Sequence, residues 1–165
     1  MLLRLTHDEP RLVALALTYH LGRPGSELDP RTKQPLDNGL AGVRRALEAQ
    51  LDAPYADIEL DARGYDRLLS AIYGSITELR VQHMRGGAAS TVAGFSEAAR
   101  RLFPQLAADP SFALDLAESL MMLHRRLERA VRRRTEQTEQ TEQADEGGVP
   151  PSGAGKKRIF RQKAT

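Results

Sequence analysis

Four arginines in the last third of the chain are the residues best suited to bind a ligand: Arg125, Arg129, Arg132 and Arg133. If residues 124–134 form a helix, these four lie near one side of it, because residues three and four apart share a face. A basic stripe of that size could hold several phosphates. The segment therefore offers nucleic-acid binding as one hypothesis.

A solvated helix end explains the same arginines without a ligand. Cations near the C-terminus of a helix are favoured by the helix macrodipole. Glu118, Glu128 and the acidic residues that follow the arginines can neutralise several of them. On the sequence alone, both interpretations stay open.

A second basic segment lies close to the last residue of the chain. Its candidate partner or phosphate contacts are Lys156, Lys157, Arg158, Ile159, Phe160 and Arg161. An aliphatic–aromatic pair in a basic setting is typical of a short docking peptide, which could anchor on a groove, a membrane surface or RNA. The alternative is a plain disordered terminus that keeps the protein soluble. No second membrane-anchoring signal accompanies the pair.

An acidic block separates the two basic segments. Residues 124–134 carry six Arg and one Glu (+5), residues 135–148 carry five acids (−5), and residues 149–165 carry five bases (+5). Residues 1–123 carry 13 bases and 16 acids, so the body is weakly acidic and the net charge of +2 conceals this pattern. The acidic block would compete for the basic segments, which weakens the nucleic-acid hypothesis.

No pattern in the chain indicates a catalytic, cofactor-binding or metal site. His124 and Glu128 have a spacing that places two ligands on one helix face, but two ligands do not make a site, and an ion pair is the simpler interpretation. The serines lack a nucleophile-elbow context and the glycines form no phosphate-binding loop. The chain has no cysteine, which excludes disulfides and thiolate chemistry. We predict no catalytic, cofactor or metal residues.

Composition favours helices and an intracellular location. Leu and Ala dominate the apolar residues, while β-branched and aromatic residues are sparse. No apolar run approaches the roughly 20 residues that span a bilayer, and the N-terminal residues lack a signal-peptide pattern. We expect a soluble, cytoplasmic protein. The 20 Arg against 4 Lys suggest a GC-rich bacterial genome.

Five amphipathic segments predict five helices. They begin after a Thr6–Glu9 capping box, at Asn38–Gly39, at Asp61, near Ser90 or Thr91, and at Asp109–Pro110. The last helix could continue through Arg134. Two short alternating pieces, near Leu3–Leu5 and Ile58–Leu60, could pair as a minimal strand ladder, although isolated pairs are marginal. The positions expected to be buried are Leu69, Ile72, Ile76, Leu120, Leu123 and Leu127.

The predicted fold is all-α: a compact bundle of about five helices with a long C-terminal helix and a disordered basic tail. We place a helical domain at residues 1–137 and a low-complexity acidic segment with the basic tail at 138–165. Residues 23–37 hold three Pro and one Gly and predict a long loop.

The leading functional hypothesis is a non-enzymatic helical interaction or scaffold protein. It would self-associate or bind an unidentified protein through its helices and use the basic tail for a second contact. The alternative is a nucleic-acid-binding accessory or regulatory protein that uses the Arg block 125–134 and the tail. An enzyme with a site lined by the 23–37 loop is a third hypothesis.

Overall fold

The computed structural model describes residues 1–23 and 39–146, with side chains up to residue 133. The predicted loop 23–37 and the basic tail therefore lie almost entirely outside the described residues. In chain order the elements are β1 (Leu2–Thr6), α1 (Glu9–Gly22), α2 (Leu40–Glu48), β2 (Tyr55–Glu59), α3 (Ala62–Met84), α4 (Phe95–Leu102), α5 (Gln105–Ala108) and α6 (Phe112–Glu146). The described residues thus form a mostly helical fold, as predicted.

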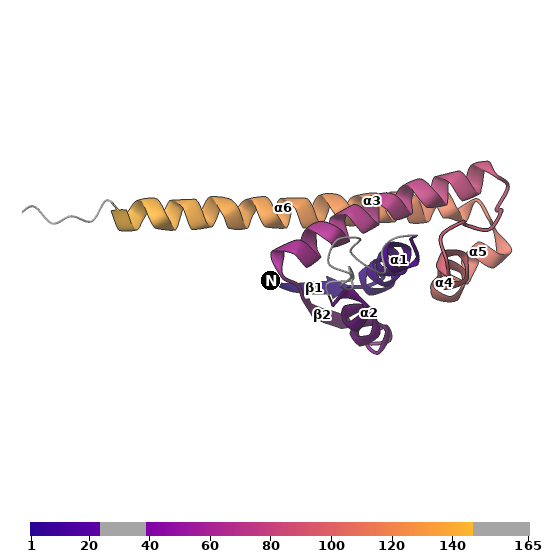
Figure 1. Cartoon of the computed structure of the whole chain (residues 1–165), viewed down its shortest axis with the longest axis horizontal. Helices are drawn as coiled ribbons and strands as arrows, with labels where there is room; N and C mark the ends of the chain where they lie inside the picture. The colour runs from indigo at the N-terminus through magenta and orange to yellow at the C-terminus, as the bar shows by residue number, and fades with distance from the viewer. Residues whose placement is uncertain (24–38, 147–165) are drawn as a thin grey trace, which may run out of the picture. The chain divides into compact units, whose positions relative to one another are not determined.

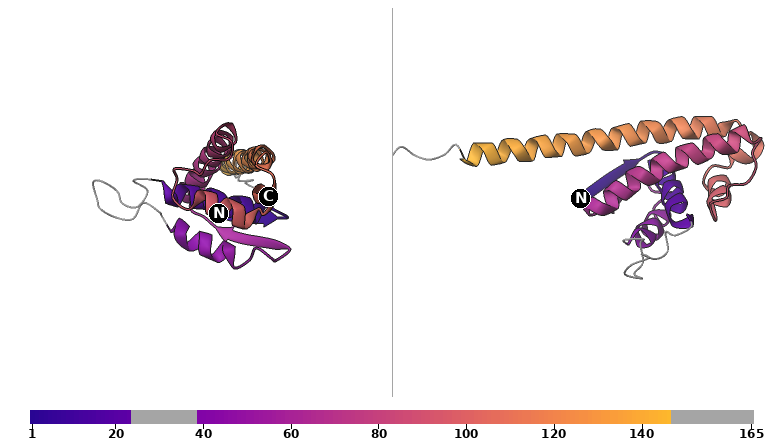
Figure 2. Two further views of the ribbon diagram at one scale, coloured as in Figure 1. Left: turned by 90° about the vertical axis from the view of Figure 1, so that its right-hand side faces the viewer. Right: turned by 45° about the horizontal axis from the view of Figure 1, so that its top comes forward.

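The chain divides into two compact units, residues 1–130 and 131–165. In the first unit α1 is central and contacts α2, α3, α4 and β1. Helix α3 and the first part of α6 lie side by side (Figures 1 and 2). The hydroxyl of Tyr65 on α3 donates a 2.7 Å hydrogen bond to the carbonyl oxygen of Leu127 on α6.

The core is built from the apolar faces of these helices. Of the six positions expected to be buried, five are: Ile72, Ile76, Leu120, Leu123 and Leu127. The prediction was wrong for Leu69, which is half-buried, because its neighbour Leu68 takes the core position. Both leucines fit the apolar spacing of α3, so spacing alone did not distinguish them.

The two short alternating pieces do pair, as an antiparallel two-stranded sheet with Leu5 opposite Ala56. The alternate residues Leu3, Leu5 and Ile58 are buried, so the sheet is stabilised by packing on the helices rather than by its own ladder. On the outer face Arg4 lies opposite Asp57 and donates hydrogen bonds of 2.9 and 2.8 Å to its carboxylate. These bonds hold the pKa of Asp57 below its usual range.

Helix α4 begins later than predicted, because local side-chain hydrogen bonds compete with its first turn. Before α4, Ser90 Oγ accepts from the Val92 amide at 2.9 Å, and Gly94 adopts φ 71°. At the start of α6, Asp109 acts as the predicted cap: its Oδ1 accepts from both the amide and the hydroxyl of Ser111, at 2.8 and 2.6 Å, which lowers the pKa of Asp109. The four-residue α5 was not predicted.

Candidate binding surface on α6

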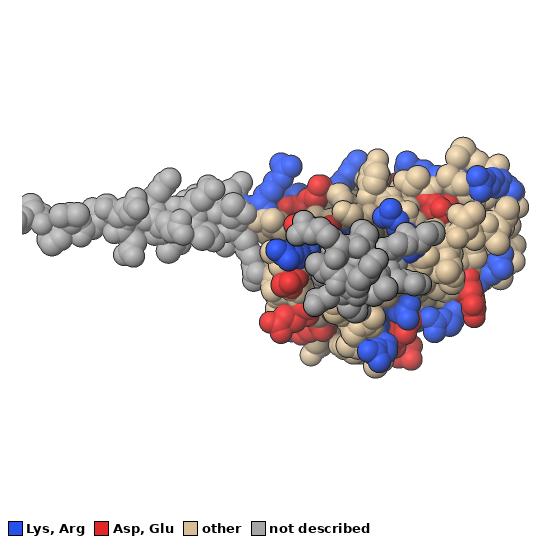
Figure 3. Space-filling view, in the orientation of Figure 1, with Lys and Arg blue, Asp and Glu red and all other residues tan. Residues whose placement is uncertain are grey.

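The predicted arginines are exposed where the structure describes them. Arg125 and Arg129 lie in the first unit, and the Nε of Arg129 donates a 3.2 Å hydrogen bond to the Arg125 carbonyl oxygen. Arg132 and Arg133 are exposed residues of the second unit. The candidate residues 156–161 lie outside the described residues. On the face seen in Figure 3, acidic and basic side chains are interspersed.

Arg126, next to Arg125 in the chain, is paired with Glu9 of α1. Its Nη2 donates a 2.8 Å hydrogen bond to Glu9 Oε2, and its Nε lies 2.8 Å from Glu9 Oε1. The same Glu9 accepts a hydrogen bond from the Thr6 amide at 2.9 Å, but the predicted cap at Thr6 is wrong, because Thr6 ends β1 and α1 begins at Glu9 after Asp8. The start of α1 is thereby tied to α6, and Arg126 contributes less than its neighbours to any free basic surface.

A groove of about 600 Å³ runs along this junction of α1 and α6. Its lining residues are Glu9, Leu12, Asp115, Glu118, Ser119, Met122, Leu123, Arg126 and Arg129. Of the predicted site residues, the groove includes only Arg129. The others that line it were not singled out from the sequence as binding residues.

An exposed apolar strip borders the groove. The side chain of Met122 is 55% exposed and that of Leu114 is 43% exposed. Leu114, Glu118 and Met122 are spaced four apart and so share one face of α6. This spacing is present in the sequence. It was not singled out because a longer apolar pattern dominates the same helix: Leu116, Leu120, Leu123 and Leu127.

Two carboxylates in the groove have no ion-pair partner within 4.0 Å among the described residues. Asp115 and Glu118 are exposed residues in the first two turns of α6, where negative charge is favoured by the helix dipole. They therefore remain available to a positively charged ligand, whereas Glu9 is already paired with Arg126. The groove combines an apolar floor with an acidic end.

His124 and Glu128 are in contact, as their spacing predicts, with 3.5 Å between Nδ1 and Oε2. The centroid of the His124 ring also lies 6.4 Å from the centroid of the Tyr73 ring on α3. Within the described residues, no three His, Cys, Asp or Glu side chains cluster as metal ligands would. No helix in that part of the chain has the length and apolar character needed to cross a membrane.

Comparison with protein-family models, with curated proteins and with solved structures finds no match to this chain.

Proposed function

We propose that this protein is a self-associating interaction protein in which the basic tail of one copy docks in the α1–α6 groove of a second copy. The observation that carries the proposal is the groove itself, in which Asp115 and Glu118 border an exposed Met122. Although Arg129 also lines the groove, the two carboxylates without an ion pair among the described residues and the exposed Met122 favour a ligand with both positive charge and apolar side chains.

The tail has that composition. Residues 156–161 read KKRIFR, which places four positive charges around Ile159 and Phe160. Apolar anchors in a groove supply most of the affinity of such a contact, and charges at the rim supply specificity and association rate. The proposal therefore assigns Ile159 and Phe160 to the floor near Met122 and Leu12, and the basic residues to Asp115 and Glu118.

The first test measures the mass of the full chain by sedimentation over a range of concentrations. We expect association that Met122→Glu weakens by at least about tenfold, or 1.4 kcal/mol. Met84→Glu is the matched control, because Met84 is also an exposed methionine (76%, against 55% for Met122) and lies at the end of α3, outside the groove lining. A chain that stays monomeric throughout, or equal losses in both variants, would refute the proposal.

A charge exchange tests the pairing directly. Asp115→Lys with Glu118→Lys should weaken association, as should Lys157→Glu with Arg158→Glu. Mixing the two variants should restore it, because each copy then supplies the charge that the other requires. Association that fails to recover in the mixture would show that the tail and the groove are not partners.

The exposure of Arg125, Arg129, Arg132 and Arg133 favours nucleic-acid binding as the second candidate function. With about six phosphate contacts, affinity should fall on the order of a thousandfold as salt rises from about 50 to about 200 mM. Replacing Arg129, Arg132 and Arg133 by Ala should flatten that slope. A steep salt dependence lost in this variant, together with no self-association, would favour this function over the first.

A further inference from the structure

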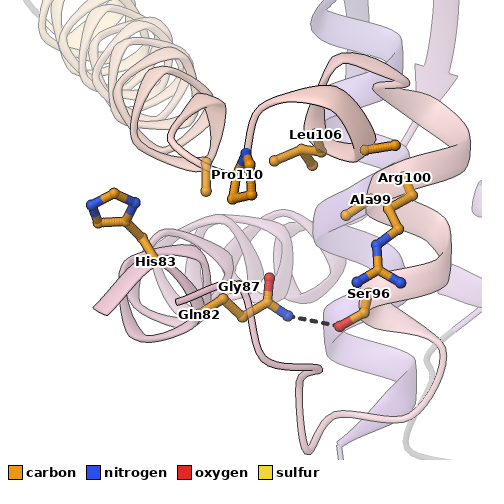
Figure 4. A pocket seen from close by; sticks show the side chains of 10 residues that line it. Gln82, His83, Gly87, Ser96, Ala99, Arg100, Leu106 and Pro110 are labelled. Atoms are coloured by element: carbon orange, nitrogen blue, oxygen red, sulfur yellow. Dashed lines mark hydrogen bonds between the residues drawn. The ribbon is translucent and has the colours of Figure 1, made fainter. Parts of the chain in front are cut away.

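A second cavity, separate from the α1–α6 groove, lies where the end of α3 meets α4, α5 and the first turn of α6. Its volume is about 380 Å³ (Figure 4). One side of the cavity is apolar and consists of Ala99, Leu106 and Pro110. At roughly 30 Å³ for each non-hydrogen atom, the share of a water molecule in the liquid, the cavity has room for about a dozen such atoms.

The hydroxyl of Ser96 on α4 has an uncommitted hydrogen that can face this cavity. Its oxygen accepts two hydrogen bonds, from Gln82 Nε2 at 2.8 Å and from the Ser90 amide at 2.7 Å. A hydroxyl has two acceptor lone pairs and one donor. Both lone pairs are used, and the hydroxyl hydrogen has no acceptor among the described residues, so Ser96 can donate to a ligand.

The loop between α3 and α4 holds the Ser96 oxygen in position to accept these two hydrogen bonds. Ser90 Oγ donates a 2.6 Å hydrogen bond to Glu78 Oε1, and Ser90 is in turn held against Ser96 through its amide. The left-handed Gly86 and Gly87, at φ 66° and 82°, allow the chain to turn back onto α3. The donor is therefore positioned before any ligand binds, which lowers the entropic cost of binding.

Arg100 supplies a positive charge beside this donor. It lies one turn after Ser96 on α4, and its guanidinium lies beside the Ser96 side chain in Figure 4. Among the described residues Arg100 forms no ion pair within 4.0 Å, not even with Glu97, which lies three residues before it on α4; Glu78 is hydrogen-bonded to Ser90, and Asp109 to Ser111. His83 also lines the cavity. The polar side of the cavity thus offers the Arg100 guanidinium and the Ser96 hydroxyl as donors, and the side-chain oxygen of Gln82 is an acceptor at its edge.

We propose that this cavity binds a small organic monocarboxylate. The carboxylate accepts hydrogen bonds from the Arg100 guanidinium and the Ser96 hydroxyl, and the apolar body packs on Ala99, Leu106 and Pro110. A guanidinium binds a carboxylate through a pair of N–H donors, and the apolar side favours a hydrocarbon chain over a second charged group. Neither contact depends on the α1–α6 groove or on self-association.

The test titrates hexanoate into the full chain and follows backbone amide resonances by NMR. We expect saturable binding with Kd below about 1 mM, with shifts at Ser96, Ala99 and Leu106. Arg100→Gln should weaken binding at least tenfold. Arg101→Gln is the matched control, because Arg101 is the adjacent arginine of α4 and pairs instead with Glu48 at 2.8 Å.

Two further probes separate the chemistry of the ligand. Hexanol has the same chain without the carboxylate, and sulfate has charge without the chain; both should bind at least tenfold more weakly than hexanoate. If hexanol bound as tightly as hexanoate, Arg100 would not contribute to binding. If sulfate bound as tightly as hexanoate, the apolar side would not contribute. No saturation by hexanoate, or equal effects of the Arg100 and Arg101 variants, would overturn the proposal.

Discussion

Adjacent leucines in α3 show how a single position decides stability. Leu68 is fully buried, while Leu69 is half-buried. Leu68→Ala should lower the free energy of unfolding by about 2–5 kcal/mol, because it removes buried methyl groups and leaves a cavity. Leu69→Ala should cost less than about 2 kcal/mol. Denaturant unfolding of both variants checks this, and equal losses would show that both side chains pack in the core.

The buried phenol of Tyr65 makes stability depend on pH above neutrality. Burial raises the pKa of Tyr65 from its ordinary value of 10.0 to about 12. The folded protein therefore holds the phenolic proton more tightly than the unfolded chain does. The stabilisation is complete below pH 10 and is lost as the pH rises toward about 12.

Tyr65→Phe tests that dependence. The variant should lose about 1 kcal/mol near neutral pH, because the hydrogen bond to the Leu127 carbonyl oxygen is removed. Its free energy of unfolding should then fall less steeply between pH 10 and 12 than that of the parent chain, as measured by urea unfolding at each pH. Parallel curves for the two proteins would contradict a buried, raised-pKa phenol.

At the scale of the elements, two glycines in helices have opposite roles. A Cβ on Gly22 would lie 2.2 Å from the Ala93 carbonyl oxygen, and the Gly22 carbonyl oxygen accepts from the Ala93 amide at 3.2 Å. The end of α1 therefore requires glycine to approach the segment before α4. A Cβ on Gly42 in α2 would have no atom of the described residues within 4 Å.

Alanine should thus destabilise one helix and stabilise the other. Gly22→Ala should cost about 1–3 kcal/mol by overpacking against backbone that must move. Gly42→Ala should gain up to about 1 kcal/mol from helix propensity. Thermal unfolding of the pair gives the comparison, and a shift of Tm in the same direction for both would contradict the close approach at Gly22.

Helix positions were largely predictable from sequence, and so were some helix starts: Asp61 caps α3 through a hydrogen bond from the Gly64 amide, and Gly39 is the cap of α2. The 4-3 spacing of Leu116, Leu120, Leu123 and Leu127 indicated a buried seam because it follows the helical period. The start of α4 was not predictable, because Ser90 binds the Val92 amide and Gly94 becomes the cap, a choice between local hydrogen bonds that composition does not resolve. Helix α5 is too short to show any period.

The binding surfaces required tertiary information. The exposed faces of Arg125 and Arg129 followed from helix geometry, but the groove beside them forms only where α6 meets Glu9 and Leu12 of α1. The second cavity likewise joins Gln82, Ser96 and Pro110 from different elements. The spacing of residues within one segment does not show which residues of another segment lie beside them. The sequence alone therefore indicated candidate binding residues but not the other residues that line each cavity.

For the whole molecule, the proposed self-association through the tail would couple apparent stability to protein concentration. A contact that forms only between folded copies stabilises them by mass action, so Tm should rise with protein concentration. A chain lacking residues 147–165 should have the Tm that the full chain approaches on dilution, because the described core residues all lie before that segment. Its Tm should not change with concentration.

Calorimetry of both chains over about a hundredfold range of protein concentration makes this comparison. A binding partner at 100 times its Kd stabilises the folded state by about 2.7 kcal/mol, so this range should give a measurable shift in Tm. Raising the salt concentration should reduce the slope for the full chain, because exposed charges such as Asp115 and Glu118 are screened over about 8 Å at physiological ionic strength. A truncated chain with a lower Tm even at high dilution would mean that the tail stabilises its own copy. A full chain whose Tm is constant at every concentration would exclude self-association as its function.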